Sequence, residues 1–231
     1  MADKPITEEW MKDNIASILN TMKEVIMNPV GFFRTMPKRG GFIDPIIFVA
    51  SMGVLMGVIN LVLSIVGLGF TRSFGMAILY IVIMPLLSVV FGFVGAAILF
   101  IIWRIMGSPE SYETAYRCGA YTSAITPVTT IIGIIPYLGG IVGIVWMAYI
   151  TVCASVEVHG IKVKTAWIVF GILFGLLLLM NISGTYTARH FNSGMEQWEK
   201  TSQDFDKMSA EEKGKAAGEF LKGMEKAIKK E

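Results

Sequence analysis

The chain has 231 residues, of which 54% are hydrophobic and only 16% are charged, and its formal net charge is +2. This composition is typical of integral membrane proteins rather than of soluble or disordered chains. The small net charge gives no indication of nucleic-acid binding, so no nucleic-acid partner is expected.

Residues 7–27 predict an amphipathic helix. Its apolar side chains recur at three- and four-residue steps between Met11 and Ile26. Asn28 and Pro29 should end it, because the residue before a proline avoids the helical region. Two interpretations stay open: the helix lies on the membrane surface, or it is an ordinary helix packed on the bundle.

The next segment combines aromatic and cationic side chains. Phenylalanine enters the acyl boundary while cations stay with anionic headgroups, which predicts a membrane-interface anchor and membrane lipids as partners. Cations that merely orient the first membrane helix explain the same pattern. Residues 1–43 are thus expected to form a cytoplasmic amphipathic and interfacial segment. The predicted interface residues are Phe32, Phe33, Arg34, Lys38 and Arg39.

Four long blocks without charged residues predict the membrane domain, residues 44–188. The third block, 118–156, has a turn signal at Pro136–Gly140 and is interpreted as a hairpin of two helices. Because a crossing needs about 20 residues, the fold class is an all-α, polytopic membrane bundle of five transmembrane helices. A shallow re-entrant hairpin is the alternative for 118–156. The predicted helices are 45–66, 75–103, 116–135, 141–158 and 165–184.

Pairs of glycines four residues apart predict close packing between membrane helices, because small side chains let two backbones approach. These pairs are Gly53 with Gly57, Gly139 with Gly143, and Gly171 with Gly175.

The third predicted helix is rich in hydroxyl groups and contains Pro127. Hydroxyls in membrane helices often bond their own backbone, which would satisfy carbonyls freed by the proline. The alternative is a polar path that faces water. Its candidate residues are Asn60, Thr122, Thr126 and Thr130.

Residues 189–231 predict a charged helical tail with an amphipathic C-terminal helix. Ser209 to Glu212 has the pattern of a capping box. The apolar stripe expected after it comprises Ala217, Phe220, Leu221, Met224 and Ile228.

The distribution of cations predicts the orientation. Seven Lys and Arg residues flank the helices on one side and three flank them on the other, which places the N-terminus in the cytoplasm and the tail outside it. The expected location is the inner (cytoplasmic) membrane. The two sets are Arg34, Lys38, Arg39, Arg104, Arg117, Lys162 and Lys164 against Arg72, Arg189 and Lys200.

A candidate cytoplasmic cluster lies at the outer ends of the hairpin. An antiparallel hairpin brings Arg117 and Glu157 to similar depth, so these two are expected to pair. Boundary charges that are simply solvated are the alternative. The candidate residues are Glu113, Arg117, Glu157 and His159.

No motif of an enzyme is present, and the two histidines lie on opposite predicted faces. We therefore expect no catalytic residues, no metal site and no cofactor.

Several short motifs follow one another along the chain: Asn28–Pro29, Phe33–Pro37, Gly41, Pro45, Tyr112, Ala115, Tyr116, Cys118, Ala120, Tyr121, Pro127, Ile135–Pro136, Gly139–Gly140, His159–Gly160, Lys164 and Ala166. Their order and spacing resemble the Yip (Ypt-interacting protein) domain family, in particular its prokaryotic branch. The resemblance covers about residues 28–180 and implies five membrane helices with a cytoplasmic N-terminus. Eukaryotic members act in membrane traffic with Rab-type GTPases, but their Asp-Leu-Tyr-Gly-Pro segment is missing here, so that role is not transferred.

Two functions fit the sequence. The first is a non-enzymatic membrane organiser or adaptor that contacts itself or another membrane protein through its terminal helices. The second is a transporter of a small solute, lipid or ion that uses the hydroxyl-rich third helix. Transporters usually carry ionisable residues inside the membrane, and none lies deep in the predicted spans, which favours the organiser.

Overall fold

The computed structural model describes residues 8–70, 73–207, 209, 211–215 and 218, and all regular structure among them is helical. The chain divides into two compact units after Ile182. In chain order the elements are α1 (Glu8–Met27), α2 (Pro29–Thr35), α3 (Ile43–Ile65), α4 (Phe74–Ile105), α5 (Tyr112–Thr122), η1 (Ser123–Ile125), α6 (Thr126–Ile132), α7 (Leu138–Glu157) and α8 (Val163–Lys207).

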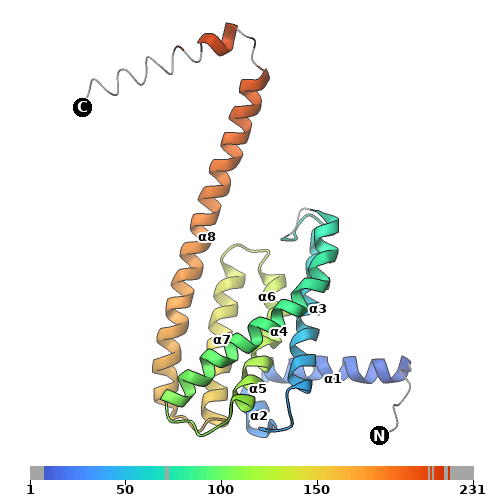
Figure 1. Cartoon of the computed structure of the whole chain (residues 1–231), viewed down its shortest axis with the longest axis vertical. Coiled ribbons are helices and arrows are strands. Elements are labelled where there is room, and N and C mark those ends of the chain that lie inside the picture. The colour runs from blue at the N-terminus through green and yellow to red at the C-terminus, as the bar shows by residue number, and fades with distance from the viewer. Residues whose placement is uncertain (1–7, 71–72, 208, 210, 216–217, 219–231) are drawn as a thin grey trace, which may run out of the picture. The chain divides into compact units, whose positions relative to one another are not determined.

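Local sequence explains the break between α1 and α2. Asn28 has an extended φ of −141°, and Pro29 occupies the first position of α2, where its missing N–H costs nothing. The Asn28 side chain caps α2 by accepting a hydrogen bond from the Gly31 amide at 3.1 Å. Figure 1 shows the consequence: α1 runs crosswise to α3 instead of continuing into the bundle.

The long apolar helices α3 and α4 pack closely against each other. A Cβ added at Gly53 would lie 2.6 Å from the Pro85 Cα, and one added at Gly57 would lie 2.7 Å from the Ile81 Cα. The two backbones therefore meet at these glycines. Pro85 lies inside α4 without ending it, as neighbouring helices permit in membrane proteins.

Four described helices are long and apolar enough to cross a membrane: α3, α4, α7 and residues Val163–Phe191 of α8. The predicted helix 116–135 is instead built of three pieces, α5, η1 and α6, none of which is long enough alone. Pro127 explains the interruption, because its ring crowds the carbonyl four residues earlier. The turn before it tightens, and the Thr126 amide donates to the Ser123 carbonyl in the 3₁₀ pattern.

The predicted boundary between the membrane domain and the tail falls at residues 188–189. Helix α8 continues through it as one helix of 45 residues. The last proline in the sequence is Pro136, so no proline interrupts α8. The capping box is present: the Glu212 carboxylate accepts from the Ser209 amide at 2.8 Å, which lowers the pKa of Glu212. The predicted stripe from Ala217 to Ile228 lies outside the described residues.

We predict that Gly53→Leu destabilises the bundle by about 1–3 kcal/mol, because the new side chain would collide with the α4 backbone. Thermal unfolding of the detergent-solubilised protein measures the effect. The matched control is Gly171→Leu, since a Cβ at Gly171 would meet nothing within 4 Å. Equal unfolding temperatures for native protein and Gly53→Leu would contradict this α3–α4 contact.

Candidate functional site

Charged side chains from distant parts of the sequence gather at one end of the first unit. The ends of α4 and α7 and the starts of α5 and α8 meet there, beside α2 and the loop that leads to α3 (Figure 1). We call this group the polar cluster. It consists of Arg34, Lys38, Glu110, Glu113, Arg117, Glu157 and His159.

Glu113 and Arg117 bind the backbone of the α2–α3 loop. One oxygen of the Glu113 carboxylate accepts hydrogen bonds from the amides of Gly40 and Gly41, at 2.8 and 2.6 Å. The Arg117 guanidinium donates to the Gly41 carbonyl at 2.7 Å. The loop needs glycine here, because φ is +139° at Gly40 and +81° at Gly41, a region that other residues rarely adopt.

Arg117 is the most buried charged side chain of the polar cluster, with 3% of its surface exposed. Its Nε atom has no hydrogen-bond partner among the described residues. A buried charge destabilises the folded state unless it is hydrogen-bonded, so loss of the Arg117 hydrogen bond to the Gly41 carbonyl would be costly.

The predicted pair of Arg117 with Glu157 is wrong. Glu157 pairs with Arg34, whose guanidinium donates to both carboxylate oxygens at 3.0 and 3.1 Å. This pairing raises the pKa of Arg34. The hairpin does bring Glu157 to the cluster, but α2 packs on α7 and presents a nearer cation.

Sequence reasoning missed Glu110 as a candidate site residue, whereas Lys38, like Arg34, was predicted only as a membrane-interface residue. Lys38 donates to Glu110 at 2.7 Å and to the Val158 carbonyl at 2.9 Å. The Lys38 carbonyl accepts from the Thr114 hydroxyl at 3.0 Å. Lys38 thus joins the α2–α3 loop to both ends of the predicted hairpin. The only sequence signal was that Glu110 shares a short loop with the predicted residue Glu113.

His159 is buried beside α4. Its ring stacks on Trp103 with centroids 3.9 Å apart, and its Nδ1 lies 2.8 Å from the Ser108 hydroxyl. Trp103 in turn donates to the Ser155 hydroxyl at 2.8 Å. The Nε2 atom of His159 is buried without a described partner. Burial lowers the pKa of His159 to about 4, against a smaller opposing effect of Glu110, so the ring is neutral at neutral pH.

The predicted interface anchor differs from the structure in its aromatic part. Phe32 and Phe33 are buried in the core, and the Phe32 ring packs edge-on against Tyr121 at 4.9 Å. Helix α2 is only 7 residues long and turns this face inward, leaving Arg34 exposed. Arg39, in the loop after α2, is also exposed. The phenylalanines therefore attach α2 to the bundle, where they cannot enter the acyl boundary.

The residues of the predicted polar path are spread over α3, α5 and α6. The amide oxygen of buried Asn60 accepts from the Phe70 amide at 2.9 Å. The Thr122 hydroxyl donates to the Gly119 carbonyl at 2.6 Å, and that of Thr130 donates to the Thr126 carbonyl at 2.9 Å. The two threonine hydroxyls thus follow the backbone-bonding alternative.

The predicted glycine pairs have different surroundings. A Cβ at Gly139 would lie 2.5 Å from the Gly133 Cα, and one at Gly143 would lie 2.9 Å from Thr129 Cγ2, so both lie where α7 meets α6 and its turn. Gly171 and Gly175 differ from the prediction, because a Cβ at either would meet nothing within 4 Å.

The described residues include no group of three or more His, Cys, Asp or Glu side chains that could hold a metal ion. Cys118 and Cys153 are both buried free thiols.

Apolar helices of membrane-spanning length, with the polar cluster at one end, define a multi-pass helical membrane protein. The sequence profile described as the Yip1 domain matches residues 23–184, a stretch that contains the whole polar cluster. The chain belongs to the Yip1 domain family, whose members are generally not enzymes. No curated protein and no solved structure matches it.

We predict that Arg34→Glu and Glu157→Arg each lower the unfolding temperature modestly and that the double exchange restores part of the loss. The reason is that only the double exchange restores opposite charges at the pair. The control is Arg117→Glu with Glu157→Arg, which should show no recovery, because Arg117 bonds Gly41. Recovery of the unfolding temperature in the Arg117→Glu, Glu157→Arg double variant, but not in the Arg34→Glu, Glu157→Arg double variant, would contradict the observed pairing.

We predict that stability falls as the pH drops from about 6.5 to about 4. In this pH window the His159 side chain binds a proton in the unfolded state but stays neutral in the folded state. The free energy of unfolding therefore falls by up to about 3 kcal/mol. Unfolding temperature against pH should flatten in His159→Phe, whereas His190→Phe should keep the native profile. An unchanged slope in His159→Phe would exclude this residue as the cause.

Proposed function

We propose that the protein is a non-enzymatic membrane organiser or adaptor of the prokaryotic Yip branch. The bundle serves as the anchor, and terminal helices make the contacts. The observation that supports this is the division of α1: Val25, near its end, is fully buried, whereas Ile15 is 58% exposed and Leu19 is 43% exposed. The exposed half presents apolar side chains that no other described part of the chain covers.

The exposed part of α1 borders a second element. Ile15 and Leu19 line an apolar groove of about 430 Å³ together with residues of α3, among them Ile47, Val54 and Val58. A groove with such a wall suits the apolar face of a helix from another membrane protein. Contact with a second copy of this chain is the other form of the same function.

The proposed topology has five crossings, with α5, η1 and α6 together making the third. The segment Tyr112–Ile132 is about 30 Å long at roughly 1.5 Å per residue. It begins in the polar cluster with Glu113 and Arg117, so the part after Arg117 would form the crossing. The end of the bundle that holds the polar cluster also carries Arg104, Lys162 and Lys164. By the positive-inside rule this end is cytoplasmic, so the N-terminus lies inside and residues 189–231 outside the inner membrane.

A transporter is the second candidate. The interruption of α5 and α6 by η1 favours it, because broken helices often line substrate sites in transporters. The hydroxyls of Thr122 and Thr130 bond their own backbone, which makes them poor ligands for a solute. We therefore rank the organiser first.

Site-specific photo-crosslinking in living cells tests the adaptor. A photoreactive residue at position 15 or 19 should give discrete protein adducts, either with another membrane protein or at the mass of a dimer. The matched control is position 17, because exposed Ser17 lies on the opposite side of α1.

Adducts with lipid alone at positions 15 and 19, or equal protein adducts at position 17, would refute the adaptor. Solute flux through vesicles containing the purified protein, abolished by Asn60→Leu, would support the transporter instead.

A further inference from the structure

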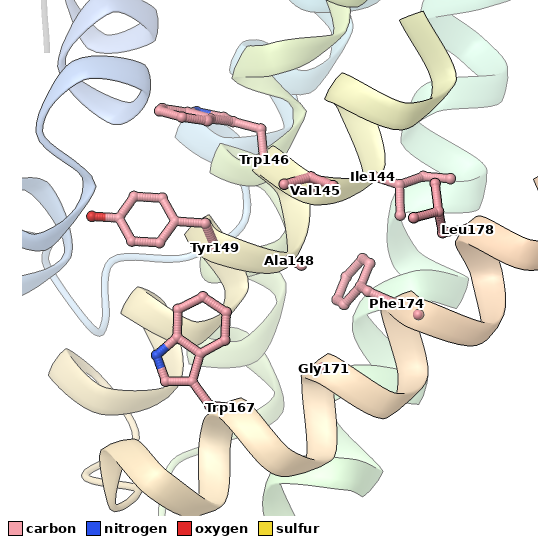
Figure 2. A pocket seen from close by; sticks show the side chains of 10 residues that line it. Ile144, Val145, Trp146, Ala148, Tyr149, Trp167, Gly171, Phe174 and Leu178 are labelled. Atoms are coloured by element: carbon pink, nitrogen blue, oxygen red, sulfur yellow. The ribbon is translucent and has the colours of Figure 1, made fainter. Parts of the chain in front are cut away.

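A groove of about 620 Å³ runs between α7 and α8, within the first unit (Figure 2). Its volume is in the range of small-molecule sites, about 300–1,000 Å³. Both helices are candidate membrane spans, so the groove opens toward hydrocarbon rather than water. No function assigned above uses it.

Missing side chains create the groove. Gly171 and Gly175 lie one turn apart on α8, and a Cβ at either would meet nothing within 4 Å. At Gly53 and Gly57 the same spacing brings two helices into contact. Here it leaves an open floor between the aromatic side chains of α7 and Phe174 of α8.

The walls of the groove change in character along its length. The rings of Tyr149 and Trp167 stack with their centroids 6.5 Å apart, near the loop that joins the two helices. Their polar atoms are suited to the headgroup region of a membrane. Phe174 and Leu178 lie further along α8 and are purely apolar. The Nε1 atom of Trp146, whose ring borders the groove in Figure 2, is buried without a described hydrogen-bond partner.

Two lysines add positive charge at the aromatic end of the groove: Lys162 directly precedes α8, and Lys164 lies in its first turn. Lys162 and Lys164 are both exposed, and Lys164 is three residues before Trp167. The sequence from Val158 to Met195 contains no Asp or Glu, so no carboxylate of that stretch neutralises them. An anionic group beside the loop would be attracted to both lysines.

We propose that this groove binds one anionic phospholipid. An acyl chain lies along Gly171 and Gly175, and the phosphate lies near Lys162 and Lys164. A molecule that is apolar at one end and anionic at the other matches the walls and the charge of the groove.

A second copy of the chain fits less well. A symmetric dimer in a membrane has its axis along the membrane normal and places equal residues at equal depth. If α8 met its own copy at Gly171, the lysines of both copies would come to the same level and repel each other. The lipid proposal does not depend on whether the protein is an adaptor or a transporter.

Native mass spectrometry of the delipidated full-length protein in detergent tests the site. Phosphatidylglycerol is the anionic probe, and phosphatidylcholine with the same chains is the neutral one. We expect one phosphatidylglycerol to bind roughly ten- to thirtyfold more tightly than phosphatidylcholine, as two nearby lysines imply.

Two sets of variants distinguish binding of the acyl chain from binding of the lipid headgroup. The double variant Gly171→Leu with Gly175→Leu should fill the groove and reduce the binding of both lipids. The double variant Lys162→Gln with Lys164→Gln should remove the preference for phosphatidylglycerol and leave folding unchanged, because both lysines are exposed. The control is Gly184→Leu, which adds the same side chain to open space on α8 beyond the groove.

Equal binding of the two lipids by the native protein would overturn the proposal, as would unchanged phosphatidylglycerol binding in the filled variant. A dimer that disappears when the groove is filled would identify a second copy as the occupant. If the filled variant fails to fold, the lysine variant still decides the case, because a preference that survives without both lysines also overturns the proposal.

Discussion

The backbone of Gly40 and Gly41 is bonded on both its donor and its acceptor sides by one turn of α5. The Glu113 carboxylate accepts hydrogen bonds from the two amides, and the Arg117 guanidinium donates one to the Gly41 carbonyl. This arrangement fixes the loop between α2 and α3, and with it the position of α2 on α7 and the start of α3. Two ion pairs flank this loop: Arg34 pairs with Glu157 on the α2 side, and Lys38 of the loop pairs with Glu110.

Burial gives these contacts different energetic weights. In the pair of Arg34 and Glu157 the arginine is largely exposed and the carboxylate is only partly exposed, so the pair fixes position more than it adds stability. Arg117 and His159 are almost fully buried, and an unmade hydrogen bond at either residue carries the full cost of desolvation. A neutral His159, stacked on Trp103, lets a polar ring occupy the core without a buried charge.

Glycine spacing illustrates how one sequence pattern gives different structures. Gly53 and Gly57 face a backbone, Gly139 and Gly143 face a turn and a threonine, and Gly171 and Gly175 face open space. In each case the pattern says only that a large side chain is missing. What fills the vacated space depends on a neighbour from a distant part of the sequence, and at α8 we infer that the neighbour is a lipid.

The sequence by itself determined the features that depend on nearest neighbours and on helix length. The apolar runs predicted four spans that the structure describes, Asn28 and Pro29 predicted the end of α1, and Ser209 predicted its capping box. These are local effects of backbone polarity, proline geometry and side-chain caps. Tertiary structure alone decided the partner of Glu157, the inward face of Phe32 and Phe33, and the open floor at Gly171. Pairing and burial depend on which segments the fold brings together, and a charge or a phenyl ring has the same local sequence signal whether it meets lipid, water or another helix.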